Sequence, residues 1–254
     1  MKKQAIGLLI FFSLFINLQA QHNTISQYST IDALMKGIYD GDMTLESLKS
    51  KGNFGIGTFN CLDGEMVFID NKFYRIQSSG KVIEVNPASK TPFAAVTFFK
   101  ADKTVDIPAG TSMARLTMII DSLIPTKNIF YAIKLTGDFS FVKSRSVPPQ
   151  KAPYKPLTEV VKTQPTFSFD NVKGIVMGFY CPPYVSGVNV TGYHLHFLKS
   201  DHLGGGHVLG FITGKAKLEI EEIDSLSLLL PDNKAFYSVD LSHNSENDVR
   251  KVEK

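Results

Sequence analysis

Three histidines lie close together in this 254-residue sequence, in the pattern H-x-H, ten residues, H. They are His194, His196 and His207. Successive side chains of a β-strand point to opposite sides, so a strand here would place His194 and His196 on one face and their apolar neighbours on the other. Residues 199–206 are polar and rich in glycine and can turn the chain back, which brings His207 to the same point. The spacing therefore predicts a cluster of three imidazoles on two neighbouring strands.

Three neutral imidazoles without a fourth local ligand are typical of a catalytic zinc site, which keeps one coordination position open for water or substrate. A structural zinc site normally has four protein ligands. Because imidazole also binds copper, nickel, iron and cobalt, the pattern predicts the site rather than the identity of its metal. The alternative is that H-x-H forms the polar face of an exposed strand, with His207 in an unrelated loop.

The first half of the chain is predicted to contain helices and a sheet. A helix is predicted over 31–38, with Ser29 or Thr30 as its cap and Gly41 as its end, and a second over 112–123, stopped by Pro125. Short strands punctuated by turn dipeptides predict an antiparallel meander and, across Gly137-Asp138, a hairpin. Their predicted ranges are 55–60, 66–69, 73–77, 130–136 and 139–146.

A segment with four prolines, residues 148–156, resists both helix and central strand and suits a linker. After it we expect a short helix near 157–162 and then strands over 166–169, 174–181, 190–198, 207–213, 216–223 and 225–230. The sequence therefore predicts an α+β fold of two sheet-rich domains, with the active site in the cleft between them. The N-terminal domain would span 21–147, and the β-rich metal-binding domain with a C-terminal tail would span 157–254.

The first twenty residues have the features of a secretory signal peptide. Lys2 and Lys3 precede an apolar stretch over 5–18, and Leu18-Gln19-Ala20 is a suitable cleavage site. A membrane anchor is the alternative, but the stretch is shorter than the roughly 20 apolar residues that a span needs. We expect cleavage after residue 20 and export to a periplasm or to the outside of the cell.

Composition excludes several classes of protein. The formal net charge is +3, from 27 basic and 24 acidic residues, and no basic run alternates with aromatic residues, so a nucleic-acid-binding surface is not expected. With Cys61 and Cys181 as the two cysteines, a disulfide framework and an all-cysteine zinc site are excluded. One bridge between them is possible, whereas the sequence favours a buried thiol in a strand for each. The usual motifs of serine hydrolases, P-loop proteins, zincins and thioredoxins are absent from the sequence.

Longer strings around the histidines resemble the alpha-acetolactate decarboxylase family. They are Gly178-Phe-Tyr-Cys-Pro-Pro-Tyr184, Asn189-Val-Thr-Gly-Tyr-His-Leu-His-Phe197 and Asp201-His-Leu-Gly-Gly-Gly-His-Val-Leu209. The similarity extends over nearly the whole chain after residue 20. It includes Gly55-Ile-Gly-Thr-Phe59, Leu62-Asp-Gly-Glu-Met66 and Lys143-Ser-Arg-Ser-Val147.

The resemblance implies a zinc-dependent decarboxylation of 2-acetolactate to acetoin and carbon dioxide in a homodimer. It implies zinc on the three histidines, with the metal chelating the hydroxyl and ketone oxygens of the substrate and stabilising an enediolate that is then protonated on one face. No thiamine or pyridoxal cofactor is then needed. The residues that the family would place around the substrate are Arg145, Glu65, Glu253 and, lining the pocket, Thr58.

Local sequence alone would not select these residues. Glu65 follows an Asp-Gly turn, Arg145 ends a predicted strand, and Glu253 lies in a charged C-terminal segment that composition describes as a frayed tail. In the implied mechanism Arg145 is always cationic and orients the leaving carboxylate. A carboxyl group of Glu65 or Glu253 would carry the proton to the intermediate.

Two other functions fit the three histidines. A zinc hydrolase or a carbonic-anhydrase-like hydratase would use the same ligands to activate water. An exported, non-catalytic metal-binding module would take up metal without turnover. Formation of acetoin from acetolactate separates the decarboxylase from both alternatives.

Overall fold

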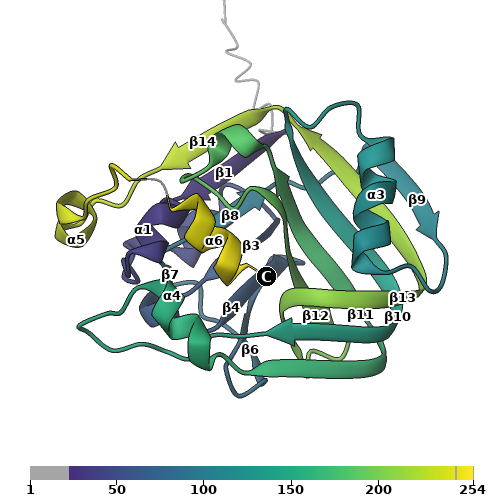
Figure 1. Cartoon of the computed structure of the whole chain (residues 1–254), viewed down its shortest axis with the longest axis horizontal. Coiled ribbons are helices and arrows are strands. Elements are labelled where there is room, and N and C mark those ends of the chain that lie inside the picture. The colour runs from purple at the N-terminus through teal and green to yellow at the C-terminus, as the bar shows by residue number, and fades with distance from the viewer. Residues whose placement is uncertain (1–22, 244, 254) are drawn as a thin grey trace, which may run out of the picture.

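Two large β-sheets pack against each other, and a group of helices lies beside them (Figure 1). The computed structural model describes residues 23–243 and 245–253. The predicted signal peptide over 1–20 lies outside the described residues. The mixture of large sheets with a few short helices confirms the predicted α+β, sheet-rich class.

The first sheet has seven strands in the order β14-β1-β8-β3-β4-β5-β6. Its middle strands, β3 to β5, run antiparallel and are joined by short connections, which confirms the predicted meander. At one edge β1 pairs with β14 in parallel. The strands are β1 (Thr24–Tyr28), β3 (Phe54–Thr58), β4 (Glu65–Ile69), β5 (Lys72–Ile76), β6 (Val82–Glu84), β8 (Ala94–Thr97) and β14 (Ser225–Leu229).

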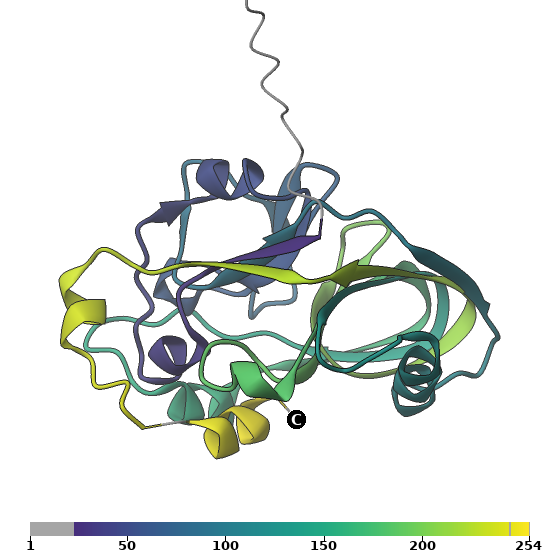
Figure 2. The same ribbon diagram turned by 90° about the horizontal axis from the view of Figure 1, so that it is seen from above.

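The second sheet has the order β10-β11-β12-β13-β9, and β10 also pairs with β13. These four long strands therefore form a closed ring of hydrogen-bonded neighbours, seen from above in Figure 2. They are β10 (Phe130–Arg145), β11 (Thr166–Cys181), β12 (Gly192–Lys199) and β13 (Gly205–Ile223), with β9 (Lys103–Ile107) outside the ring. A small third sheet joins β2 (Met43–Thr44) to β7 (Lys90–Thr91).

The predicted hairpin across Gly137-Asp138 is wrong, because β10 runs through both residues as one strand. Gly137 serves close packing instead of a turn: a Cβ there would lie 2.4 Å from the carbonyl oxygen of Lys215. The β10–β13 register shifts between Gly137 and Phe139, as it does at a β-bulge, and such an irregularity bends a strand. The strands predicted separately over 166–169 and 174–181 are likewise one strand, β11. Those predicted over 207–213 and 216–223 are one strand, β13.

Three of the helices lie at the predicted positions. The Thr30 hydroxyl accepts a hydrogen bond from the Ala33 amide and caps α1 (Ile31–Met35), and α3 (Met113–Leu123) is capped by Ser112. However, α1 ends before Gly37, whose φ of +87° suits a helix end, so the predicted end at Gly41 is wrong. The third is α4 (Leu157–Val160), which continues into η2 (Val161–Thr163). The remaining helical segments are α2 (Leu45–Lys49), η1 (Asn60–Leu62), η3 (Pro183–Val185), α5 (Lys234–Ser238) and α6 (Glu246–Val252).

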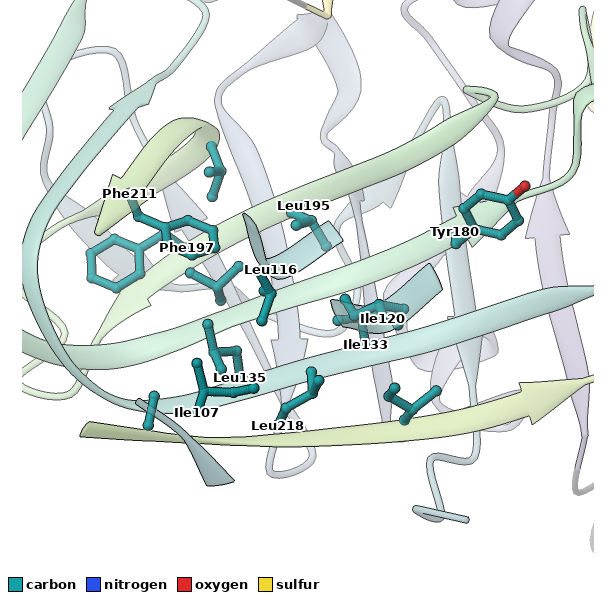
Figure 3. Close-up of a cluster of buried hydrophobic side chains, with 14 of the residues drawn as sticks. Ile107, Leu116, Ile120, Ile133, Leu135, Tyr180, Leu195, Phe197, Phe211 and Leu218 are labelled. Carbon is teal, nitrogen blue, oxygen red and sulfur yellow. The ribbon is translucent and has the colours of Figure 1, made fainter. Parts of the chain in front are cut away.

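Two apolar clusters fix the position of the second sheet. One fills the ring of strands and is closed by α3, with Leu116 and Ile120 beside Leu195 and Phe197 (Figure 3). The other joins the two large sheets, for example through Ile56 and Met177. The strands of the ring are therefore packed on both sides, which gives the histidine-bearing strand β12 a rigid support.

Both large sheets contain strands from each side of residues 148–156. The first sheet includes β14 from the second half of the chain, and the second sheet includes β9 and β10 from the first half. The predicted division into two domains at this segment stays a prediction. No helix within 23–243 and 245–253 is both long and apolar enough to cross a membrane.

Both cysteines are free thiols, so the possible bridge between them is absent. Cys181 is buried at the end of β11, as predicted. Cys61 is not in a strand: it lies in η1 with a φ of +63° and is only half-buried.

Glu221 on β13 is completely buried, and no salt bridge reaches it within the described residues. Burial, with the nearby charge of Asp102, raises the pKa of Glu221 from 4.5 to about 7. Between these two values the folded state binds more protons than the unfolded state, so the free energy of unfolding falls as pH rises from about 4.5 to about 7.

The Glu221→Gln variant should therefore be more stable than the parent above pH 7, by up to about 3 kcal/mol, and no more stable near pH 4. Denaturant unfolding at the two pH values measures this difference. Glu222→Gln is the matched control, because Glu222 is partly exposed and pairs with Lys103 at 2.8 Å. An equal response of both variants to pH would contradict the role of burial.

Candidate metal centre

Strand β12 presents His194 and His196 on one face, as the alternation of side chains predicts. Leu195 and Phe197 point into the apolar interior of the strand ring. In the β12–β13 register His196 lies directly opposite His207, so the third ring comes to the same place across one strand boundary. The turn between these strands, with the Lys199 amide donating to the Gly204 carbonyl at 2.9 Å, is the one the sequence predicts.

The three imidazoles form a compact, buried cluster. One nitrogen of each ring lies within 4.8 Å of those of the other two. The ring centroids of His194 are 5.1 Å from His196 and 5.0 Å from His207. These distances bring the three rings within reach of a single ion, with small side-chain adjustments.

One ring nitrogen is buried without a partner. The Nδ1 atom of His196 lies 2.8 Å from the carbonyl oxygen of Met66 on β4. A carbonyl can only accept, so Nδ1 carries the proton and Nε2 presents its lone pair to the cluster. That Nε2 atom has no hydrogen-bond partner. A backbone carbonyl that fixes the tautomer of a ligating histidine is a recurrent feature of metal sites.

The electrostatics of the cluster favour neutral rings. Burial, with the charge of Arg145, lowers the pKa of His194 to about 3. Burial also holds the pKa of His196 and His207 well below the ordinary value for histidine. Three neutral imidazoles, each with one ring nitrogen close to those of the other two, and no sulfur ligand, fit zinc or another divalent ion of similar preference.

The predicted acidic and basic residues surround the same point. Arg145 ends β10 directly opposite His207, and Glu65 begins β4. Nε2 of His196 lies 3.5 Å from Glu65 Oε2, and Nε2 of His207 lies 3.5 Å from Glu253 Oε2. Nη1 of Arg145 lies 3.7 Å from Glu65 Oε1, and Nη2 lies 3.9 Å from Glu253 Oε1.

Glu253 is not in a frayed tail. It directly follows α6, whose Val249 and Val252 are buried in an apolar cluster with residues of α1 and α4. Nη2 of Arg145 also donates to the Val252 carbonyl at 2.8 Å. The composition of this segment hides two apolar anchors at helical spacing, and these hold the last described residues against the site.

Both carboxyl groups have pKa values close to neutral pH. Burial raises the pKa of Glu65 to about 7, although Arg145 opposes the shift and Glu253 adds to it. Burial likewise raises the pKa of Glu253 to about 7, again against the effect of Arg145. A carboxyl in this range can both donate and accept a proton near pH 7.

Thr58 lies beside Glu65, its partner in the β3–β4 register, and it is buried. Its hydroxyl donates to the Gly64 carbonyl at 2.7 Å, which supports the turn before Glu65. Because its hydrogen is used there, Thr58 can only accept from a ligand.

The polar groups line a small cavity of about 40 Å³, room for about three water molecules. Apolar residues line the same cavity, and sequence reasoning missed this part of the lining. They come from α1, the β3–β4 connection, the β7–β8 connection, the segment after β10, α4 and α6: Ile31, Leu34, Leu62, Phe93, Val147, Leu157 and Val252. Helical periodicity marked Ile31 and Leu34 as buried, but nothing in the sequence says that they face the histidines.

Gly178 on β11 lets β12 approach closely enough to place His194. A Cβ at Gly178 would lie 2.1 Å from the His194 carbonyl oxygen, which is backbone and cannot rotate away. Gly178→Ala should therefore lower stability by about 1–3 kcal/mol and weaken metal binding, measured by thermal unfolding and metal titration. Gly210→Ala on β13 is the control, because a Cβ there meets nothing within 4 Å. Equal behaviour of the two variants would contradict this account.

Comparisons with known proteins identify the family of this chain. The family model described as alpha-acetolactate decarboxylase matches residues 25–243, a range that includes the three histidines, Glu65 and Arg145 but not Glu253. The alpha-acetolactate decarboxylase of Brevibacillus brevis is 44% identical over 234 residues, covering 92% of this chain and 82% of that protein. The one from Methanosarcina mazei is 43% identical over 232 residues, covering 91% and 81%.

A solved structure supports the same assignment. The crystal structure of alpha-acetolactate decarboxylase from Bacillus subtilis strain 168 superposes with a TM-score of 0.89 at 40% sequence identity, covering 91% of this chain and 99% of that one. Sequence and fold thus match over nearly the whole described chain. This chain belongs to the alpha-acetolactate decarboxylase family.

Proposed function

We propose that this chain converts 2-acetolactate to acetoin and carbon dioxide, with zinc held by His194, His196 and His207. The observation that carries the proposal is the buried triad of neutral imidazoles with Glu65, Arg145 and Glu253 around it. Membership of the family supports the substrate.

Decarboxylation breaks the bond between the carboxylate carbon and the hydroxyl-bearing carbon of 2-acetolactate. The electron pair moves toward the neighbouring ketone oxygen, and one proton must then be added to carbon. A zinc ion on the three histidines would act as a Lewis acid where this negative charge develops. Nε2 of His196, which is buried and makes no hydrogen bond, supports its place there.

Arg145 is suited to orient the carboxylate that leaves. Its side chain is 3% exposed, its charge is permanent, and its guanidinium faces the cavity from the strand that pairs with His207. Orientation of a reacting group in a buried site lowers the barrier by removing motion that would otherwise be lost in the transition state.

Glu65 and Glu253 are suited to carry the proton. Both line the cavity, and both have a pKa near 7 as a result of burial. A carboxyl fixed on one side of a planar intermediate delivers its proton to that face, so the acetoin formed should be mainly one enantiomer.

The apolar residues that line the same cavity suit the two methyl groups of the substrate. They also lower the polarity around the site, which strengthens the electrostatic effect of Arg145 on charge in the cavity. The small volume and this lining favour small, branched hydroxy-keto acids over longer or more polar ones.

Removal of the metal should abolish turnover. Protein dialysed against a chelator should form acetoin and carbon dioxide from racemic acetolactate at less than about 1% of the untreated rate, and added zinc should restore it. The metal-loaded form should also unfold at a higher temperature, because the ion binds only the folded state. Full turnover after verified metal removal would refute the zinc-dependent mechanism.

We further propose that the chain is exported and acts as a homodimer. The signal-like residues 1–20 support export, and the family resemblance supports the dimer. Leu226 and Leu228, each 38% exposed on the edge strand β14, also suit a contact between subunits. N-terminal sequencing of exported protein and light scattering test these two statements.

A further inference from the structure

Arg145 makes two hydrogen bonds, and two carboxyl groups lie near it at ion-pair distance. Nη1 donates to Oε1 of Gln164 at 2.9 Å, and Nη2 donates to the Val252 carbonyl at 2.8 Å. Both acceptors are neutral. The carboxylates of Glu65 and Glu253 lie at 3.7 and 3.9 Å, beyond good hydrogen-bond length. Gln164 is thus the side chain that fixes the direction of the guanidinium.

Gln164 is itself fixed by the backbone around it. It directly follows η2, and its backbone amide donates to the Val161 carbonyl at 3.3 Å. Two residues later Thr166 pairs with Arg145 in the β10–β11 register, and the Ser146 amide donates to the Pro165 carbonyl at 3.2 Å. The side chain that holds Arg145 therefore starts from a backbone tied to the strand of Arg145 itself.

We propose that Gln164 is a positioning residue, which presets Arg145 to receive the carboxylate of the substrate. Gln164 does not line the cavity, so it acts through Arg145 rather than by contact with the ligand. A neutral amide is the appropriate acceptor here: it orients the guanidinium without competing with the substrate for its charge. The inference rests on the function proposed above, because it concerns the residue that orients Arg145 for binding of the substrate carboxylate.

The test replaces Gln164 by methionine, which keeps the length of the side chain and removes the acceptor. Two ligands are titrated calorimetrically into zinc-loaded protein: 2-hydroxy-2-methylpropanoate, which carries a carboxylate, and acetoin, which does not. We expect Gln164→Met to lower the binding affinity for the carboxylate ligand about tenfold and the affinity for acetoin less than twofold. For acetolactate we expect KM to rise about tenfold with kcat changed less than threefold.

Gln150→Met is the matched control, since Gln150 lies in the 148–156 segment, where its side chain donates to the Pro148 carbonyl at 2.8 Å. Unchanged carboxylate binding in Gln164→Met would overturn the proposal. An equal loss of affinity for both ligands would also overturn the proposal, because such a loss would show a general distortion of the cavity. The titrations do not need turnover, so failure of wild-type protein to form acetoin would refute the proposed function separately.

Discussion

The His207→Ala variant should lose metal binding and at least about a thousandfold in kcat/KM for acetolactate, while it keeps its fold. His207 lies near the start of β13, opposite both His196 and Arg145, so its ring completes the cluster from the strand beside β12. Two imidazoles remain in the variant, but they hold a divalent ion much more weakly than three. Metal analysis after dialysis and an acetoin assay measure the two losses.

His202→Ala is the matched control for this substitution. His202 lies in the turn before β13 and is exposed, outside the cavity. It should behave like the parent in metal content and rate. A His207→Ala variant that retains one metal per chain and normal turnover would disprove the role of the triad.

The Arg145→Met variant should lose about 100- to 1000-fold in kcat/KM and keep its metal. Its guanidinium is buried between two carboxyl groups, whose pKa values it lowers. Without it both pKa values rise further, so Glu65 and Glu253 become neutral at pH 7 rather than remaining as unpaired charges. The fold should therefore survive, and the loss should lie in binding of the substrate carboxylate.

Lys143→Met on the same strand provides the control, because Lys143 is exposed. Arg145→Lys should lie between the parent and Arg145→Met, since it keeps the charge but cannot make both hydrogen bonds in the same geometry. If Arg145→Met lost its metal as well, the arginine would be part of the structure of the metal centre rather than a binder of carboxylate. Circular dichroism and metal analysis make this distinction.

The metal cluster could be predicted because its geometry is local. Period-two alternation separates His194 and His196 from Leu195, and a glycine-rich turn is sufficient to return the chain to His207. Local patterns also identified α3 and the meander of β3 to β5. They failed at Gly137, since a glycine that makes room for a neighbouring strand looks the same in sequence as a glycine in a turn.

The rest of the site depends on long-range packing. Glu253 reaches the histidines only because Val249 and Val252 dock α6 against α1 and α4, which lie far away in the sequence. The hydrogen bond from Arg145 to Gln164 and the one from His196 to Met66 also join distant segments. No periodicity or motif contains these contacts, so family resemblance was needed to propose Glu65, Arg145 and Glu253, and nothing pointed to Gln164.

Each large sheet contains strands from both sides of residues 148–156, and this has a consequence if the chain is cleaved in that segment. Much of this segment is exposed, so a protease could cleave it. The two fragments would nevertheless remain interlocked, because β14 stays in the sheet of the first fragment, and β9 and β10 stay in that of the second. A nicked molecule should thus migrate as two bands under denaturing conditions and elute as one particle under native ones, with Arg145 and His207 still neighbours across the break.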